Sequence, residues 1–113
     1  IFVTCALTAL GLAYVDDGLT AEAQPLLERA VNNRERHEAD APARLGEVHF
    51  ALARALWPIA DQRVRAGALA ERARKEFAAA IATPALARAL DAVDRWLRAN
   101  QPTTVAATKP DAV

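Results

Sequence analysis

The chain has 113 residues, enough for one small domain, and its 14 basic and 14 acidic residues give a net charge of zero. A protein that binds nucleic acid would normally carry a clear excess of basic residues, so we expect no nucleic-acid partner. Apolar residues make up 53% of the chain and aromatic residues only 5%, and much of the apolar fraction is alanine, which favours closely packed helices over a sheet.

The single cysteine and the first residues of the chain bear on the cellular compartment of the protein. The single cysteine, Cys5, cannot form an internal disulfide, so we expect a reducing, cytoplasmic environment. The chain has no methionine and begins with Ile1, which indicates a segment of a longer protein. Residues 1–15 are uncharged and could belong to a spanning helix or a signal sequence. The run is shorter than the roughly 20 residues that a spanning helix needs and lacks a basic leader, so we favour a buried helix and expect no membrane partner.

The apolar spacing predicts five helices, of which the first two form a pair. The first helix is expected over residues 2–15, and the following turn Asp16-Asp17-Gly18 offers a glycine for the left-handed conformation of a C-cap. Thr20 is the expected N-cap of the second helix, which runs to about residue 36. The mixed charges of residues 28–36 are interpreted as a solvated helix end.

The third and fourth helices are expected to form a second pair. Asp40 is the predicted cap of the third helix, which ends at Trp57-Pro58 because proline disfavours helix in the residue before it. Asp61 is the predicted cap of the fourth helix, which runs to about residue 81.

The fifth helix has the pattern of a cap at the end of a helical stack. Thr83-Pro84 is a strong start signal, and the helix runs to about residue 99. One side is an apolar stripe and the other is charged, as a terminal helix with one wet face requires. The stripe consists of Leu86, Leu90, Val93 and Leu97, and the charged side contains the pairs Asp91 with Arg95 and Asp94 with Arg98. Residues 1–100 are therefore predicted to be one helical domain, and residues 101–113 a disordered tail.

A repeated pattern links the two helix pairs. The first reads Leu7-x-x-Leu10-Gly11-x-x-Tyr14 and then Ala23-x-x-x-Leu27-x-x-Ala30, and 42 residues after Leu10 the series continues with Leu52, Ala53 and Leu56. Small residues at the crossing let the paired helices approach. The residues expected to pack the repeats are Leu7, Leu10, Gly11, Tyr14, Ala23, Leu27, Ala30, Leu52, Ala53 and Leu56.

This pattern resembles the tetratricopeptide repeat, W-x-x-L-G-x-x-Y followed by A-x-x-x-F and a further small residue. The spacing of the two copies is longer than the usual period of 34 residues, and residues 22–30 (Glu-Ala-Gln-Pro-Leu-Leu-Glu-Arg-Ala) are similar to the long repeats of kinesin light chains. The ordered part is also similar to C-terminal repeat segments of bacterial, myxobacterial-type serine/threonine kinases, through residues 45–57 and 92–97. The resemblance implies an all-α fold of antiparallel helix pairs stacked as a short tetratricopeptide solenoid with a C-terminal capping helix.

The resemblance also implies a function. Such a solenoid binds a protein, a peptide or another domain of its parent chain on its concave side, so we expect a scaffolding or regulatory module of a larger bacterial signalling protein. The alternatives are a spacer or capping end without its own ligand, and a fragment of a repeat-containing transcriptional regulator. The candidates for the binding groove are Thr8, Leu12, Glu47, Phe50, Arg54 and Trp57, with Cys5 beside them on the first helix.

Nothing in the sequence predicts an enzyme. The only histidines, His37 and His49, are far apart and have no cysteine or carboxylate at ligand spacing, so we expect no metal and no cofactor. His49 is interpreted as filler of the core or its boundary, His37 as a solvated loop residue, and Asp16-Asp17 as turn residues. The chain has no glycine-rich loop or other kinase motif, so any kinase domain of the parent protein would lie outside it.

Overall fold

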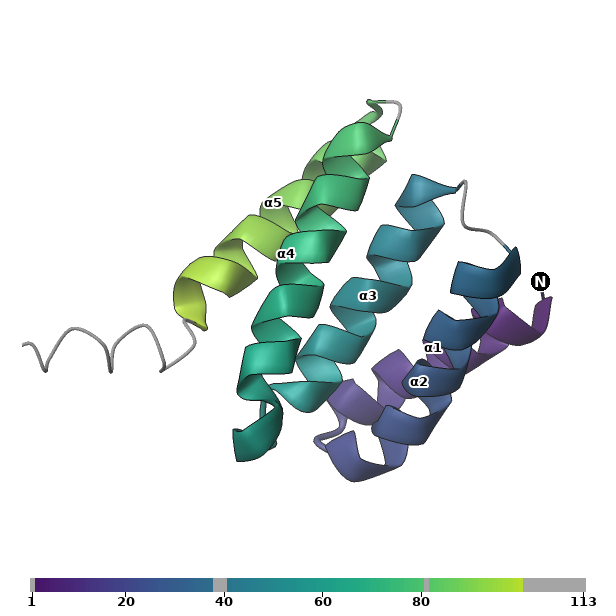
Figure 1. The fold of residues 1–113 in the computed structure, drawn as a ribbon, viewed down its shortest axis with the longest axis vertical. Coiled ribbons are helices and arrows are strands. Elements are labelled where there is room, and N and C mark those ends of the chain that lie inside the picture. Colours follow the sequence, from purple (N-terminus) through teal and green to yellow (C-terminus); the bar gives the residue numbers. More distant parts are fainter. Residues whose placement is uncertain (1, 38–40, 81, 101–113) are drawn as a thin grey trace, which may run out of the picture.

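The protein is all-α. The structure, a computed structural model, describes residues 2–37, 41–80 and 82–100, and the side chains from residue 6 onward. Every element in these ranges is a helix, which confirms the all-α part of the predicted fold class (Figure 1). The predicted disordered tail and the groove position of Cys5 lie outside the described part.

Within the described ranges, five α-helices and one 3-10 turn follow one another along the chain. Each α-helix packs against the next, in alternating direction, and α1 also contacts α3 (Figure 1). None of the described helices is long and apolar enough to cross a membrane. The elements are α1 (Phe2–Asp16), α2 (Thr20–His37), α3 (Pro42–Leu56), η1 (Ala60–Gln62), α4 (Arg63–Ala79) and α5 (Pro84–Ala99).

The turn between α1 and α2 is fixed by Gly18. Its φ of 79° lies in the left-handed region, as the sequence predicted. The amide of Leu19 donates to the carbonyl of Tyr14 at 2.8 Å, and that of Gly18 donates to Val15 at 3.0 Å. This pair of bonds is a Schellman motif, which satisfies carbonyls at the end of α1 and reverses the chain within three residues.

The predicted helix starts are only partly correct. The Thr83 hydroxyl accepts a hydrogen bond from the Leu86 amide at 3.1 Å, which confirms Thr83 as the N-cap residue of α5. The Asp61 cap is wrong, because Asp61 lies inside η1 and α4 begins after Gln62 without a side-chain cap. The N-cap of α3 is Ala41, likewise without a side-chain bond, and Asp40, its predicted cap, lies outside the described residues.

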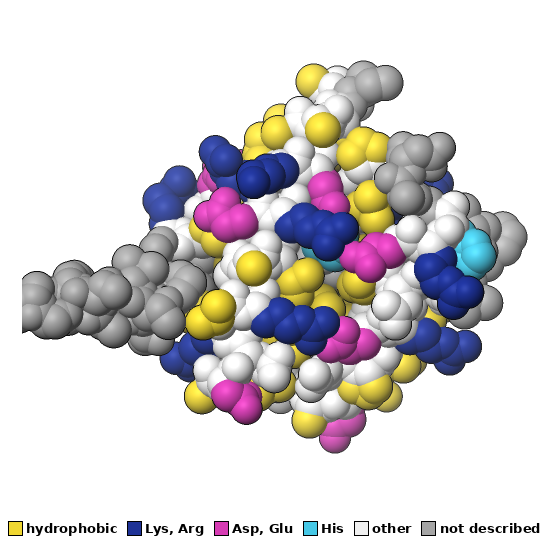
Figure 2. All heavy atoms as spheres, in the orientation of Figure 1, with side chains coloured by type: hydrophobic (Ala, Val, Ile, Leu, Met, Phe, Trp, Pro, Cys, Tyr) yellow, Lys and Arg dark blue, Asp and Glu magenta, His cyan; other side chains and the backbone are white. Residues whose placement is uncertain are grey.

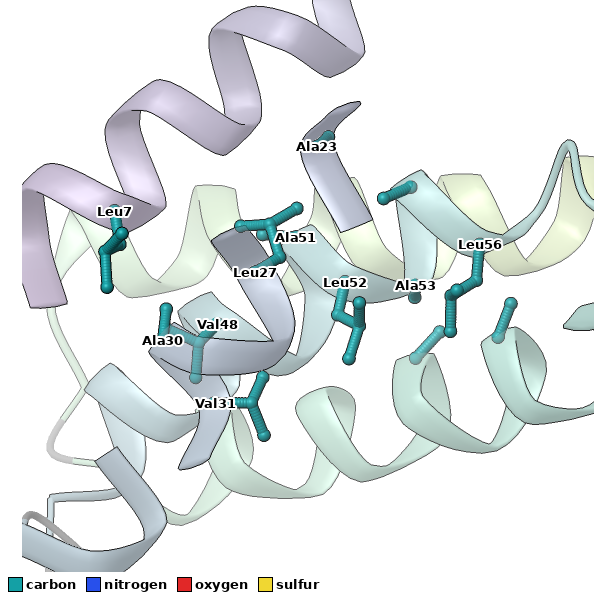
Figure 3. Packing of buried hydrophobic residues seen from close by; sticks show 13 residues of the cluster. Leu7, Ala23, Leu27, Ala30, Val31, Val48, Ala51, Leu52, Ala53 and Leu56 are labelled. Atoms are coloured by element: carbon teal, nitrogen blue, oxygen red, sulfur yellow. The ribbon is translucent and has the colours of Figure 1, made fainter. Parts of the chain in front are cut away.

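A core of small and branched aliphatic side chains holds the helices together (Figure 3). Leu7, Ala23, Leu27, Ala30, Leu52, Ala53 and Leu56, seven of the residues predicted to pack the repeats, are buried. Alanine leaves little bulk at a helix crossing, so the helix axes can lie close together.

Gly11 marks the closest contact between α1 and α2. A Cβ at this position would lie 2.6 Å from two carbons of Leu27, which is itself completely buried. Ala23 is also fully buried. The crossing therefore has no room for a larger side chain at either of these positions.

Leu10 does not behave like its counterpart in the second pair. It is 46% exposed, whereas Leu52 is completely buried. Helix α3 lies between α2 and α4, but the described residues place no helix on the outer side of α1. The expected packing role of Leu10 is therefore wrong. Tyr14, which belongs to the same repeat pattern on α1, is half-buried.

Helix α5 lays its apolar stripe against the rest of the domain. Val93 is fully buried and forms a small cluster with Ala73 and Phe77 of α4, while the three leucines of the stripe are partly buried around it. Asp91 pairs with Arg95 as predicted, at 2.9 Å. The predicted Asp94 pair is corrected, because Asp94 instead accepts a 2.6 Å hydrogen bond from Arg74 of α4.

Figure 2 shows basic and acidic side chains beside one another on one face of the molecule. Exposed ion pairs join helices that are distant in sequence. Arg65 of α4 donates two hydrogen bonds, of 2.6 and 2.8 Å, to the carboxylate of Glu28 on α2. These bonds hold the pKa of Glu28 below its ordinary value of 4.5, although partial burial acts in the opposite direction. The same pairing raises the pKa of Arg65.

We predict that Gly11→Leu destabilises the protein by about 1–3 kcal/mol, because the new side chain overpacks the crossing against Leu27. The measurement is the free energy of unfolding in urea. Ala13→Leu, an exposed change on the same helix, is the control and should have little effect. Equal stabilities for the two variants would show that α1 and α2 do not cross at Gly11.

We predict that Val93→Ala costs about 2 kcal/mol, from two lost methyl groups and the cavity they leave. Val64→Ala removes the same atoms from a side chain that is 60% exposed, and should change stability by less than about 0.5 kcal/mol. Thermal and urea unfolding of both variants provide the comparison. A Val93→Ala protein as stable as Val64→Ala would mean that α5 is not docked in solution.

We predict a small acid-sensitive contribution from Glu28. A lowered folded pKa means that the pair stabilises the protein above the ordinary value of 4.5 and loses this effect as the pH falls through the folded pKa. Because both side chains are substantially exposed, the amount is at most about 1 kcal/mol. The stability gap between wild type and Glu28→Gln should shrink by that amount on acidification. In a protein that already carries Arg65→Gln, the change Glu28→Gln should show no such closing gap, because the cation that lowers the pKa of Glu28 is gone.

Candidate functional site

A groove of about 570 Å³ opens between α1, α3 and α5. We use the term groove for this hollow throughout. Leu12 lines it from α1, Phe50 from α3 and Leu86 from α5, with Phe77 of α4 also in its wall. The groove therefore draws on helices from both pairs and on the terminal helix, and it needs all of them in place.

Four of the six groove candidates line this hollow. They are Leu12, Glu47, Phe50 and Arg54. Thr8 lies in a smaller hollow of about 220 Å³ that shares Leu12 and Glu47 with the groove. The helical spacing of the candidates thus brought residues of the first and third helices to one surface.

Trp57 lies elsewhere, at the junction of α3, η1 and α5. Its ring meets that of Trp96 edge to face, with centroids 5.5 Å apart, and the guanidinium of Arg63 lies 5.0 Å from its centroid. Arg63 also donates to the Trp57 carbonyl at 2.9 Å. Trp96 in turn contacts Phe50 edge to face, with ring centroids 5.9 Å apart. The aromatic cluster therefore packs against Phe50, which lines the groove. Trp57 supports the groove and does not line it.

Arg34 contributes to the groove in a way that the sequence did not indicate. The predicted solvated helix end is wrong at this position, since Arg34 is only 2% exposed. Its guanidinium donates to the Arg44 carbonyl and to the Glu47 carboxylate, both at 3.0 Å. A buried guanidinium needs such partners, and this one joins the end of α2 to the start of α3 beside the groove.

The groove is apolar in its interior and carries more positive than negative charge. The residues that line it include Arg34, Arg44 and Arg54 and one acidic residue, Glu47. Arg54 donates to Asp16 at the end of α1, at 2.9 Å, and remains one-third exposed. The groove can therefore receive apolar side chains while arginine groups interact with carbonyl or carboxylate oxygens.

His49 lies on another side of α3 and is completely buried, within the predicted core role. No carboxylate stands at ligand spacing from His49 in the sequence, but two carboxylates contact its ring in space. Its Nε2 lies 2.8 Å from Glu35 of α2 and its Nδ1 lies 2.6 Å from Glu76 of α4. These neighbours are too distant in sequence to form a recognisable motif. Among the residues with described side chains, no group of three or more histidine, cysteine, aspartate or glutamate residues could hold a metal ion.

Comparisons of this chain with protein-family models, with curated proteins and with solved structures find no match.

Proposed function

We propose that the chain is a tetratricopeptide-type interaction module that binds a polypeptide segment in the groove. The observation that carries the proposal is that Leu12 of α1 and Glu47, Phe50 and Arg54 of α3, chosen from their places in the repeat, line one hollow. The packing of each helix against its neighbour, with α1 also touching α3, supports two stacked helix pairs. Concave surfaces of such stacks are where repeat proteins bind their partners.

The chemistry of the groove suits a peptide. Aromatic and arginine side chains are enriched among residues that dominate binding energy at interfaces, and the groove offers Phe50, Phe77 and Arg54 together. Its volume lies within the range of about 300–1,000 Å³ that ligand pockets commonly have. Apolar side chains of a peptide would occupy the interior, and its carbonyl or acidic groups would meet the arginines.

The wider role that we propose is regulatory. A module of this kind would hold a partner, or another domain of its own chain, within a larger bacterial signalling protein such as a serine/threonine kinase. The second candidate is a capping end of a longer helical stack. It is favoured by α5, which buries Val93 on one side and exposes Asp91 and Arg95 on the other. A cap without a ligand of its own would leave the groove unused.

The proposal is tested by filling the groove without removing any of its contacts. Ala92 of α5 is exposed and lines the groove, whereas Ala87 is exposed on the same helix and is not part of the lining. Peptides are selected from a random library on the wild-type protein, and their affinities are measured for Ala92→Trp and Ala87→Trp. We expect Ala92→Trp to weaken binding about tenfold or more, equivalent to about 1.4 kcal/mol, and Ala87→Trp to leave it unchanged.

Thermal unfolding of both variants shows whether the fold is intact. Equal affinities for the two tryptophan variants would place the bound peptide outside the groove. A library that yields no binder would favour the capping end.

A further inference from the structure

His49 stands at the centre of a charged cluster that joins three helices. We use the term His49 cluster for His49, Glu35, Glu76 and Arg72. The ring contacts Glu35 of α2 through Nε2 at 2.8 Å and Glu76 of α4 through Nδ1 at 2.6 Å. Arg72 of α4 lies 3.4 Å from each of these carboxylates and is half exposed, so it covers the cluster from the solvent side.

The geometry of the His49 cluster sets a condition on its protons. A neutral imidazole has one nitrogen that donates and one that accepts, whereas an ionised carboxylate only accepts. Both ring contacts are therefore hydrogen bonds to ionised carboxylates only when both ring nitrogens carry protons. In that state the positive charges of His49 and Arg72 balance the negative charges of Glu35 and Glu76. Removal of one ring proton leaves a buried lone pair facing a carboxylate, which is unfavourable.

Each helix of the His49 cluster also lines the groove through the adjacent residue. Glu35 follows Arg34, His49 precedes Phe50, and Glu76 precedes Phe77, and these three neighbours all line the groove. Successive residues on an α-helix are turned by about 100°, so one residue of each pair can face the cluster while the other faces the groove. A change in the spacing of α2, α3 and α4 at the cluster must therefore move groove-lining side chains.

We propose that His49 is a proton-dependent tie between α2, α3 and α4 that controls the shape of the groove. Its effect on ligand binding rests on the function proposed above. The charged groups that face the ring are Glu35 from α2 and Glu76 and Arg72 from α4. The residues of α1 and α5 that line the groove carry no charge; they are Leu12, Ala85, Leu86, Ala89 and Ala92.

The direction of the pH effect follows from proton counting. The proposed tie requires protons on both ring nitrogens, whereas the unfolded chain has no such requirement. Folding then binds a proton, and stability falls with rising pH, by up to a tenfold change in the unfolding equilibrium constant per pH unit. We measure this constant in urea from about pH 5 to about pH 8, where histidine is the side chain that ordinarily titrates.

The variants isolate the ring. We expect the unfolding equilibrium constant to rise with pH, by at most tenfold per unit, in wild type and in His37→Gln, which removes the other, exposed histidine at the end of α2. His49→Gln should abolish this rise, because an amide can hydrogen-bond but does not titrate. A His49→Gln protein with the same pH dependence as wild type would overturn the proposal.

A second measurement uses the unaltered protein and covers the case in which His49→Gln does not fold. Nitrogen-15 chemical shifts of the His49 ring show whether one or both nitrogens carry protons. We expect both to be protonated at neutral pH. A nitrogen that stays unprotonated across the whole pH range contradicts the tie.

The coupling to the groove is read from Phe50 and Phe77. Their ring resonances should shift with the same midpoint as the His49 ring in wild type and in His37→Gln. Rings that stay fixed while His49 titrates would overturn the control of the groove. Because this readout needs no ligand, it stands or falls separately from the peptide-binding test with Ala92→Trp.

Discussion

The enclosure of α3 by its neighbours is the constraint on which the rest of the structure depends. Nine of its 15 residues are buried, and α2, α4 and α1 all contact it. A helix surrounded in this way must offer small or apolar side chains on most of its circumference, because each added methylene would force the neighbouring helices apart. Ala51, Ala53 and Ala55 meet this demand and are almost completely buried.

Arg34 of α2 and His49 of α3 are buried, and each contacts partners on another helix. Arg34 is bonded to a carbonyl and a carboxylate, and His49 lies between two carboxylates. A buried charge without partners would cost far more free energy than these contacts return, so each group depends on residues from a second helix. Arg34 and His49 therefore favour one register of α2, α3 and α4. The small alanine side chains of α3 would by themselves allow other registers.

The sequence predicted features that depend on local geometry. Gly18 in its left-handed turn, Thr83 as the cap of α5, and the end of α3 before Pro58 each follow from neighbours within a few residues. The repeat pattern also brought Phe50 and Arg54 to the same hollow as Leu12.

Features that depend on the meeting of distant helices were missed. The charged neighbours of Arg34 in the sequence predict a solvated side chain. Its burial instead depends on contacts with Arg44 and Glu47 of α3, ten or more residues away. The partners of His49 lie 14 and 27 residues from it, a separation at which one sequence carries no pairing signal. Asp94 had a plausible partner four residues away, yet α4 supplied a better one in Arg74. Leu10 fits the repeat pattern but lacks the covering helix that the pattern assumes.

The junction of α3 and α5 has a spectroscopic consequence. Trp57 and Trp96 are the chain's two tryptophans, and their rings are in contact there, with Arg63 against one of them. Tryptophan fluorescence therefore observes this junction, because α1 and α2 contain no indole. Opening of the first helix pair alone would change the tryptophan emission less than it lowers the helical signal in far-ultraviolet circular dichroism. Disagreement between the two probes would thus report separate unfolding of the two ends, and agreement would mean that the five helices melt as one unit.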